Sequence, residues 1–304
     1  MSSLQIAPDT AEGWDAEAQA SLSRSARARL LRRPGFLLAA FFVLLMIVVS
    51  MVPQAFAGWF GHGNPLACNL AYSADGPRSG HPFGFDVQGC DVYANVIYGA
   101  RDSIAIGLLA SAFALVVAVV LGCLSAYYLG IIDTIVSRLA DIFFGFPFIL
   151  GALVLLTALK SHGVWTVSAA LALFLWPTLT RLMRASILSV KQMDYVLAAR
   201  SIGVSDWRLI RKHLLPNAIA PVIVISALGI GGVIAAEATL TFLGVGLEAP
   251  AISWGLQLSQ AQSNFQVHPH LLVFPALFLS LTVFSFIVLG DALEDVLDPR
   301  RNES

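Results

Sequence analysis

Residues 184–217 combine basic and apolar side chains in a pattern that suits binding to a surface more than catalysis. The side chains of Trp207, Ile210 and Leu214 fall at positions i, i+3 and i+7, which places them on one face of a helix. The segment is too polar to cross a membrane and too apolar to be a simple tether, so this face needs a cover. Two covers remain open at this point: the lipid headgroup layer, with basic side chains on lipid phosphates, or a groove on a partner protein.

Helix-stop signals divide this segment into two short helices. The first is expected at about residues 190–202, because Gly203 follows and readily adopts the positive φ of a helix end. The second is expected to start after Ser205, whose hydroxyl can cap a helix, and to end near Pro216. The pattern therefore predicts two short helices in succession.

Glu237 is an ionisable residue inside an apolar run. Its neighbours Ala235, Ala236 and Ala238 are small, which lets another helix approach closely. A carboxylate within a bilayer is costly unless it faces protein or water. Two interpretations follow. Either Glu237 and Thr241 belong to a translocation path or gate, or Glu237 accepts N–H bonds from a loop such as residues 243–254.

Cys68 and Cys90 lie in a stretch rich in Gly, Pro, Asn and Asp, which indicates turns. Outside a reducing cytosol they can form a disulfide that restricts the unfolded loop by roughly 3 kcal/mol. Two free thiols, or a metal site with His62 or His81, are the alternatives. No compact ligand spacing is visible, and His268-Pro269-His270 is interpreted as incidental, so no metal is expected.

The composition identifies the elements that must position these residues. Of the 304 residues, 57% are apolar and 12% are charged, and the mean hydropathy is +0.77. A soluble protein carries about a quarter charged residues, so the chain is expected to be an integral membrane protein. Its net charge of −1 excludes nucleic acid as an expected partner.

Six continuous apolar runs are long enough to cross about 30 Å of hydrocarbon as helices. Continuous runs also argue against β-barrel strands, which alternate. The fold class predicted is therefore an all-α, polytopic bundle of six transmembrane helices. The runs cover residues 36–57, 103–129, 135–159, 164–182, 218–243 and 271–293. Pro147 and Pro177 are expected to kink their helices.

The basic residues set the orientation. With the N-terminus inside, fifteen of the 18 Lys and Arg residues fall on the cytoplasmic side, and both termini are cytoplasmic. Residues 1–34 are interpreted as a cytoplasmic tail and residues 35–304 as the transmembrane domain, with an outer loop at about 58–95. The rival interpretation is a cleavable export signal ending at Ala55-Phe56-Ala57, but its apolar run exceeds the usual signal core. Asp141 is expected to pair with Arg138, and Trp254 and Phe265 to be interfacial anchors.

The segment at 184–217 resembles the EAA loop of ATP-binding-cassette (ABC) importer permeases. In that loop Glu-Ala-Ala is followed by a Gly and then by Leu-Pro; here Leu197 replaces the Glu. The resemblance implies that this segment contacts an ATPase. The positions assigned to that contact are Ala198, Ala199, Arg200, Gly203, Trp207, Ile210, Arg211, His213, Leu214 and Pro216.

Three further motifs are similar to the dipeptide, oligopeptide and nickel branch of these permeases, smaller-subunit type. They begin at His81-Pro82, Glu237-Ala238 and Gly290-Asp291, and the second is followed by Ser253-Trp254-Gly255. Phe85 and Cys90 depart from the branch's Thr and Arg. The resemblance extends over about residues 30–301.

The resemblance implies a type I importer permease of the cytoplasmic (inner) membrane that forms half of a path for di- or oligopeptides. Its partners would be a homologous second permease, two cytosolic ATPase subunits or domains and an extracytoplasmic substrate-binding protein. No phosphate-binding loop is present in the sequence, so no cofactor is expected in this chain, and partner ATPases would bind ATP and Mg²⁺. An ion-gradient transporter or channel is the alternative, and a membrane-embedded enzyme is disfavoured because no catalytic motif lies in the spans.

Overall fold

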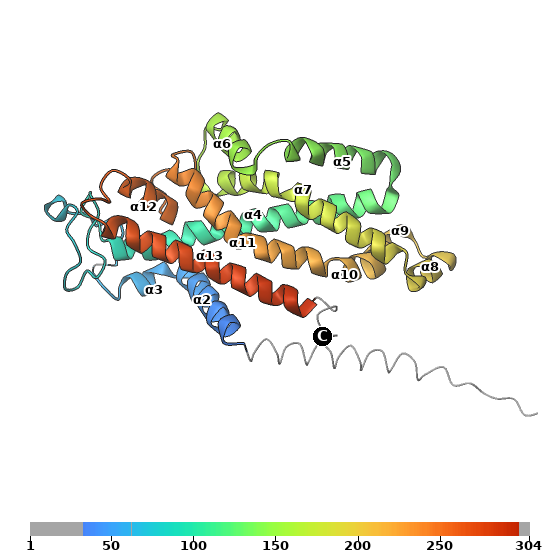
Figure 1. Ribbon diagram of the computed structural model, residues 1–304, viewed down its shortest axis with the longest axis horizontal. Coiled ribbons are helices and arrows are strands. Elements are labelled where there is room, and N and C mark those ends of the chain that lie inside the picture. The colour runs from blue at the N-terminus through green and yellow to red at the C-terminus, as the bar shows by residue number, and fades with distance from the viewer. Residues whose placement is uncertain (1–32, 62, 298–304) are drawn as a thin grey trace, which may run out of the picture.

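The computed structural model describes residues 33–61 and 63–297, and this part of the chain is almost entirely helical, with no strand. Figure 1 shows an elongated bundle in which the long helices run side by side. The elements up to residue 191 are α2 (Pro34–Met51), α3 (Pro53–Ala57), η1 (Leu70–Tyr72), α4 (Val92–Tyr128), α5 (Gly130–Phe144), α6 (Phe148–Ala158) and α7 (Val164–Lys191). They are followed by α8 (Asp194–Ser201), α9 (Asp206–Leu209), η2 (Ile210–Leu214), α10 (Leu215–Ala218), α11 (Ala220–Phe242), α12 (Trp254–Ala261) and α13 (His270–Leu297).

Five of the described helices are long and apolar enough to cross a membrane, namely α2, α4, α7, α11 and α13. The predicted span at 135–159 is not one helix, because α5 and α6 meet at an angle of 90°. The break lies at Gly145–Pro147, where a proline cannot continue the preceding helix. If the bent pair is one broken span, the total is six. The kink predicted at Pro147 is thus a full break, whereas α7 continues through Pro177.

Small buried side chains explain why α4 is the central helix. Gly107, Ala110, Ala114, Ala118 and Gly122 recur at intervals of three or four residues and let neighbouring backbones approach. A Cβ added at Gly122 would lie 2.6 Å from the Cβ of Met183 on α7. On its other sides α4 contacts α11 and α2, and α13 packs against both of these helices.

The start of α4 is earlier than the predicted position at residue 103. Asp91 is the N-cap, and its Oδ1 accepts hydrogen bonds from the backbone N–H of Tyr93 at 2.8 Å and Ala94 at 3.4 Å. The helix therefore begins at Val92 and the outer loop ends at Asp91 rather than near residue 95. The loop and α12 lie at one end of the bundle, and α8 and α9 lie at the other (Figure 1).

The predicted tail falls almost entirely outside the described residues, as do Asp298, Pro299, Arg300 and Arg301 of the closing motif. At the described edge, Arg33 forms an ion pair with Asp295, which connects the start of α2 to the end of α13.

Candidate functional site

The segment between α7 and α11 forms a helical hairpin at one end of the bundle (Figure 1). Helix α8 ends as predicted, with Gly203 at φ 80°. The N–H of Val204 donates to the carbonyl of Ala199 at 3.2 Å, and the N–H of Gly203 donates to that of Arg200 at 3.1 Å. This pair of bonds is a Schellman motif, which satisfies carbonyls that the helix end would leave unpaired. The first helix of the prediction is confirmed, although it begins at Asp194 rather than near residue 190.

The second predicted helix does not end near Pro216, as the sequence analysis expected. Pro216 does not stop it, because Pro216 occupies the first turn of α10, where a missing N–H is tolerated. The preceding residues Ile210–Leu214 form a π-helix, so the chain winds through α9, η2 and α10 and runs on to α11 after Ile219. Ser205 precedes α9 at the N-cap position, but its side chain makes no cap hydrogen bond.

The prediction that Trp207, Ile210 and Leu214 form one apolar face in need of a cover is wrong. Ile210 and Leu214 are buried with exposed fractions of 8% and 0%, whereas Trp207 is 71% exposed. The buried pair packs into a core cluster that includes Val196 and Ile187 of this chain. The physical reason is that α7 and α8 cover one side of the second helix, so only the side bearing Trp207 remains available.

Five large apolar side chains remain exposed on the hairpin, and we call them the hairpin patch: Met193, Tyr195, Leu197, Ile202 and Trp207. Of the other candidate residues in this segment, those on the surface are Ala198, Arg200, Gly203, Arg211 and Pro216. Ala199 is buried and His213 is half-buried, with its ring centroid 6.5 Å from that of Tyr195. The structure therefore separates the ten candidates into a surface set and a packing set.

A polar junction that the sequence analysis missed ties this hairpin to the bundle. The hydroxyl of Tyr127, near the end of α4, donates to Asp206 Oδ1 at the start of α9. Lys191, at the end of α7, donates from Nζ to the carbonyls of Ala126 at 3.2 Å and Tyr127 at 2.8 Å. The junction thus holds the ends of α4, α7 and the start of α9 together. Tyr127, Lys191 and Asp206 are far apart in sequence, so no local pattern predicted that they form a junction.

Tyr127→Phe is expected to loosen the hairpin without disturbing the core. The change removes one hydrogen bond, with a net contribution of about 0.5–1.5 kcal/mol, and keeps the ring. Amide hydrogen exchange across residues 206–214 should therefore accelerate by roughly twofold to tenfold. Tyr128→Phe is the matched control, because Tyr128 is 52% exposed and adjacent in sequence. Equal exchange in both variants would contradict the role of the junction.

Ion pairs hold α5 against α7 near the same end of the bundle. Arg184 donates to both carboxylate oxygens of Asp133, at 2.6 Å and 2.7 Å. Asp141 pairs with Arg181 and, at 3.7 Å, with Arg138, as predicted for Asp141 and Arg138. A two-bond Arg–carboxylate contact fixes orientation as well as distance, so α5 is held as a unit with α7.

Glu237 is fully buried inside this chain. Its Oε1 accepts a hydrogen bond from the hydroxyl of Thr241 at 2.9 Å, and that hydroxyl accepts one from the N–H of Leu247 at 3.0 Å. The hydroxyls of Ser103 on α4 and Ser253 before α12 lie beside the carboxyl group of Glu237, whose Oε2 has no hydrogen-bond partner among the described residues. The group therefore connects α4, α11 and the segment that follows α11.

The segment before α12 is bound to α4 at several further points. The N–H of Trp254 donates to Ser103 Oγ at 3.2 Å, and the N–H of Ile252 donates to Asp102 Oδ2 at 3.2 Å. Trp254 is fully buried and its Nε1–H donates to the carbonyl of Val96 at 2.9 Å. The interpretation of Trp254 as an interfacial anchor is therefore wrong, because its polar N–H is satisfied within the protein.

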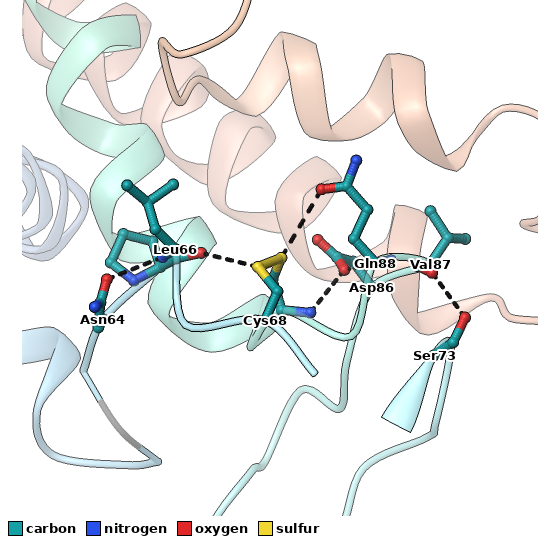
Figure 2. Close-up of a disulfide and its surroundings, with 9 residues drawn as sticks. Asn64, Leu66, Cys68, Ser73, Asp86, Val87 and Gln88 are labelled. Atoms are coloured by element: carbon teal, nitrogen blue, oxygen red, sulfur yellow. Dashed lines mark hydrogen bonds between the residues drawn. A yellow bond between two sulfur atoms is a disulfide. The ribbon is translucent and has the colours of Figure 1, made fainter. Parts of the chain in front are cut away.

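The outer loop contains the predicted disulfide between Cys68 and Cys90, shown in Figure 2. Beside it, Asp86 Oδ1 accepts the N–H bonds of Gln88 and Cys90, both at 2.8 Å. Burial raises the pKa of the Asp86 carboxyl, and these amide bonds oppose the increase. The disulfide and this turn give a loop with little regular secondary structure a defined shape.

The histidines of the outer side take part in packing. His81 Nδ1 lies 2.7 Å from Asp91 Oδ2, and His270 Nε2 lies 3.1 Å from the carbonyl of Phe85. Within residues 33–61 and 63–297 no group of three His, Cys, Asp or Glu side chains is placed to hold a metal ion. Cys123 is buried among apolar side chains of α4 and α7.

A helical bundle with a short helical hairpin at one end and a broken third span has the fold of type I ABC importer permeases. It resembles the crystal structure of an amino acid ABC transporter with histidines (TM-score 0.52, 16% identity, covering 67% of this chain and 94% of that one). It also resembles the inward-facing MetNI methionine ABC transporter (TM-score 0.53, 18% identity, covering 67% and 97%). At these identities the likeness establishes the fold.

Sequence comparison establishes the family. Residues 118–303 match the model of the binding-protein-dependent transport system inner membrane component family, and this chain belongs to that family. It is 36% identical over 276 residues to the glutathione transport system permease protein GsiD of Pectobacterium atrosepticum, covering 90% of this chain and 89% of that protein. It is 37% identical over 266 residues to GsiD of Escherichia coli O157:H7, covering 86% and 85%. The chain is therefore a multi-pass permease subunit of the dipeptide, oligopeptide and nickel type, and not an enzyme.

Proposed function

We propose that this permease moves short peptides, glutathione among them, into the cell and that the hairpin patch receives the driving movement from an ATPase. The glutathione permeases that it resembles support the substrate class. The observation that carries the coupling role is the hairpin patch itself, which exposes five large apolar side chains on a hairpin fixed to α4 by the Tyr127–Asp206 bond.

The distribution of basic residues supports an orientation in which α8 and α9 face the cytoplasm. The described part of the hairpin end carries Arg138, Arg181, Arg184, Lys191, Arg200, Arg208, Arg211 and Lys212. Residues 244–270, at the other end, contain no Lys or Arg. An excess of Lys and Arg marks cytoplasmic segments, so both termini would also be cytoplasmic.

The position of the hairpin favours a protein partner over lipid as the cover of the patch. Helix α8 projects past the end of α7 along the long axis of the bundle (Figure 1). A helix that serves the headgroup layer lies in the membrane plane with its apolar face toward the acyl chains. Here the apolar patch includes Ile202, which is 82% exposed, in the turn between α8 and α9. An apolar groove rimmed by acidic groups would suit Trp207 together with Arg200 and Arg211.

The assembly that we propose contains four kinds of component. This chain pairs with a homologous second permease, two cytosolic ATPase subunits or domains bind the hairpins, and an extracytoplasmic binding protein delivers the peptide. ATP and Mg²⁺ would be bound by the ATPases, and no cofactor would be bound by this chain.

We also propose that Glu237 and Thr241 belong to a gate on the extracytoplasmic side. The hydroxyl of Thr241 donates to Glu237 and accepts a bond from the N–H of Leu247. The carboxyl group of Glu237 also lies beside Ser103, whose hydroxyl accepts a bond from the N–H of Trp254. A displacement of α11 relative to α4 would therefore move the segment at residues 243–253, between α11 and α12.

Purification from native membranes tests the proposal. ATPase chains should co-purify with the detergent-solubilised permease. Vesicles that contain the complete complex and its binding protein should transport tritiated glutathione only when ATP is supplied on the side of the membrane that the ATPases face. A permease that purifies alone and transports with an ion gradient would contradict the proposal. Uptake of another solute in place of peptides would overturn the substrate class while leaving the coupling role intact.

A further inference from the structure

A cavity of about 200 Å³ lies between α4, α7 and α11. Three hydroxyl side chains line it, one from each helix: Ser111, Thr178 and Ser226. Ser111 is near the middle of α4 and Thr178 is near the middle of α7. The cavity therefore lies about midway along both helices. The other lining residues are Leu175, Leu179, Ile225, Gly229 and Val233, and none is charged.

Two of the three hydroxyl side chains are buried, with exposed fractions of 6% at Ser111 and 8% at Ser226. Among the described residues none of the three forms a hydrogen bond within the chain. Hydroxyls elsewhere in the spans are of both kinds. Those of Ser50, Ser125 and Thr239 donate to carbonyls three or four residues earlier in their own helices. Those of Ser168, Thr180 and Thr282 have no partner among the described residues, but they do not line the cavity. Because the cavity gives access to the hydroxyls of Ser111 and Ser226, these groups are free to exchange hydrogen bonds with a polar ligand that enters it.

The cavity is open on one side of the chain. Thr178 is exposed, and a Cβ added at Gly229 would have no heavy atom within 4 Å. Its volume is below the roughly 300–1,000 Å³ of sites that enclose a whole small molecule. It can therefore hold one residue of a peptide, and a second permease facing it would enclose the rest.

We infer that this cavity is a contact site for the main-chain amide groups of a short peptide in transit, an inference that rests on the proposed transport of peptides. A hydroxyl both donates and accepts hydrogen bonds, so it can pair with either the N–H or the C=O of a peptide unit. Because the lining carries no charge, it has no counter-ion that would retain a peptide terminus. Such a site tolerates different side chains and binds weakly enough to release the peptide.

Glu237 does not compete for this role, because it is fully buried and its carboxyl group is engaged with Thr241. The hydroxyl cavity lies farther from the outer segment along α11, with Ser226 and Gly229 two to three helical turns before Glu237. Substrate contact and outer gate are thus separate places on the same helix.

Filling the cavity from Gly229 is the first test. In the complete complex in vesicles, Gly229→Ala, Gly229→Val and Gly229→Phe should lower uptake of tritiated glutathione and of dialanine progressively, with the phenylalanine variant losing at least tenfold. ATPase subunits should still co-purify, because a Cβ at position 229 meets no neighbouring atom and the assembly of the complex is left undisturbed. Gly232→Phe is the matched control: a Cβ at Gly232 also has no atom within 4 Å, and Gly232 does not line the cavity. Equal uptake in Gly229→Phe and Gly232→Phe would overturn the inference.

Two further measurements separate contact from folding. Ser226→Ala should raise the KM for uptake by roughly threefold to tenfold with little change in kcat, as expected for the loss of about one hydrogen bond to the ligand. In a Cys123→Ala background, a cysteine introduced by Gly229→Cys should react with a methanethiosulfonate reagent and be protected by dialanine. Reaction without protection would overturn the inference. Failure of the unaltered complex to transport any peptide would instead count against the proposed function.

Discussion

Replacing Trp207 by alanine is expected to abolish most ATP-driven uptake while the permease itself remains folded. Trp207 is 71% exposed, so its removal takes little from the core of this chain. On a partner surface, however, a large aromatic side chain seated in a pocket commonly contributes 2 kcal/mol or more, which is about a thirtyfold loss of affinity. The measurement is peptide-stimulated ATP hydrolysis by the reconstituted complex, which should fall toward its basal rate.

A second tryptophan of the chain provides the control for this variant. Trp165, at the start of α7 and at the opposite end of the bundle, is 67% exposed. Trp165→Ala therefore removes a side chain of similar size and exposure that lies far from the hairpin. Single changes at Arg200 or Arg211 should cost less, because exposed ion pairs contribute only about 0–1 kcal/mol. Unchanged stimulation of ATP hydrolysis in Trp207→Ala would remove the hairpin patch from the coupling role.

The contrast between Trp207 and its helix neighbours shows what the sequence could not predict. Periodicity placed Trp207, Ile210 and Leu214 on one face, and that assignment treats the helix as if it were alone. In the structure α7 and α8 approach from one side and bury Ile210 and Leu214. Which part of an apolar face is covered depends on the direction from which other helices arrive, and spacing along one helix carries no information about that direction.

The spans were predictable because an apolar run of about 20 residues has few other uses in a protein. Their ends were less predictable, since the cap at Asp91 and the π-helix at Ile210–Leu214 change where a helix begins or how it passes a proline. The break at Pro147 was predicted as a kink, whereas α5 and α6 meet at 90° and both contact α7. The apolar runs thus predicted the elements, whereas caps and irregular turns set their limits.

The polar network illustrates the same division. A buried carboxylate at Glu237 was predictable as an unusual residue, and its partner Thr241 lies one helical turn away. Ser103 is more than a hundred positions earlier in the chain, and nothing in its surroundings marks it as a partner. In one interpretation Glu237 accepts backbone N–H bonds from residues 243–254. In the structure the N–H of Leu247 donates to the hydroxyl of Thr241, and that hydroxyl donates to Glu237.

Glu237→Ala is expected to release the segment between α11 and α12 and to prevent uptake. The change leaves the hydroxyl of Thr241 without its acceptor, and an unsatisfied buried group costs about 1–3 kcal/mol. It also opens a cavity in a fully buried position, which adds to the loss. Amide hydrogen exchange across residues 247–256 should accelerate by at least a hundredfold, and the thermal unfolding temperature of the complex should fall.

Glu237→Gln separates hydrogen bonding from charge. The glutamine has the same size and keeps a carbonyl oxygen that can accept the bond from Thr241, so the outer segment should stay ordered and much of the uptake should remain. If the glutamine variant loses uptake as fully as the alanine variant while residues 247–256 exchange at the original rate, the negative charge itself acts in transport. That result would replace the gate with a role for Glu237 in the path. If the alanine variant leaves both exchange and uptake unchanged, neither role holds, because the network would then not bind the segment that it contacts.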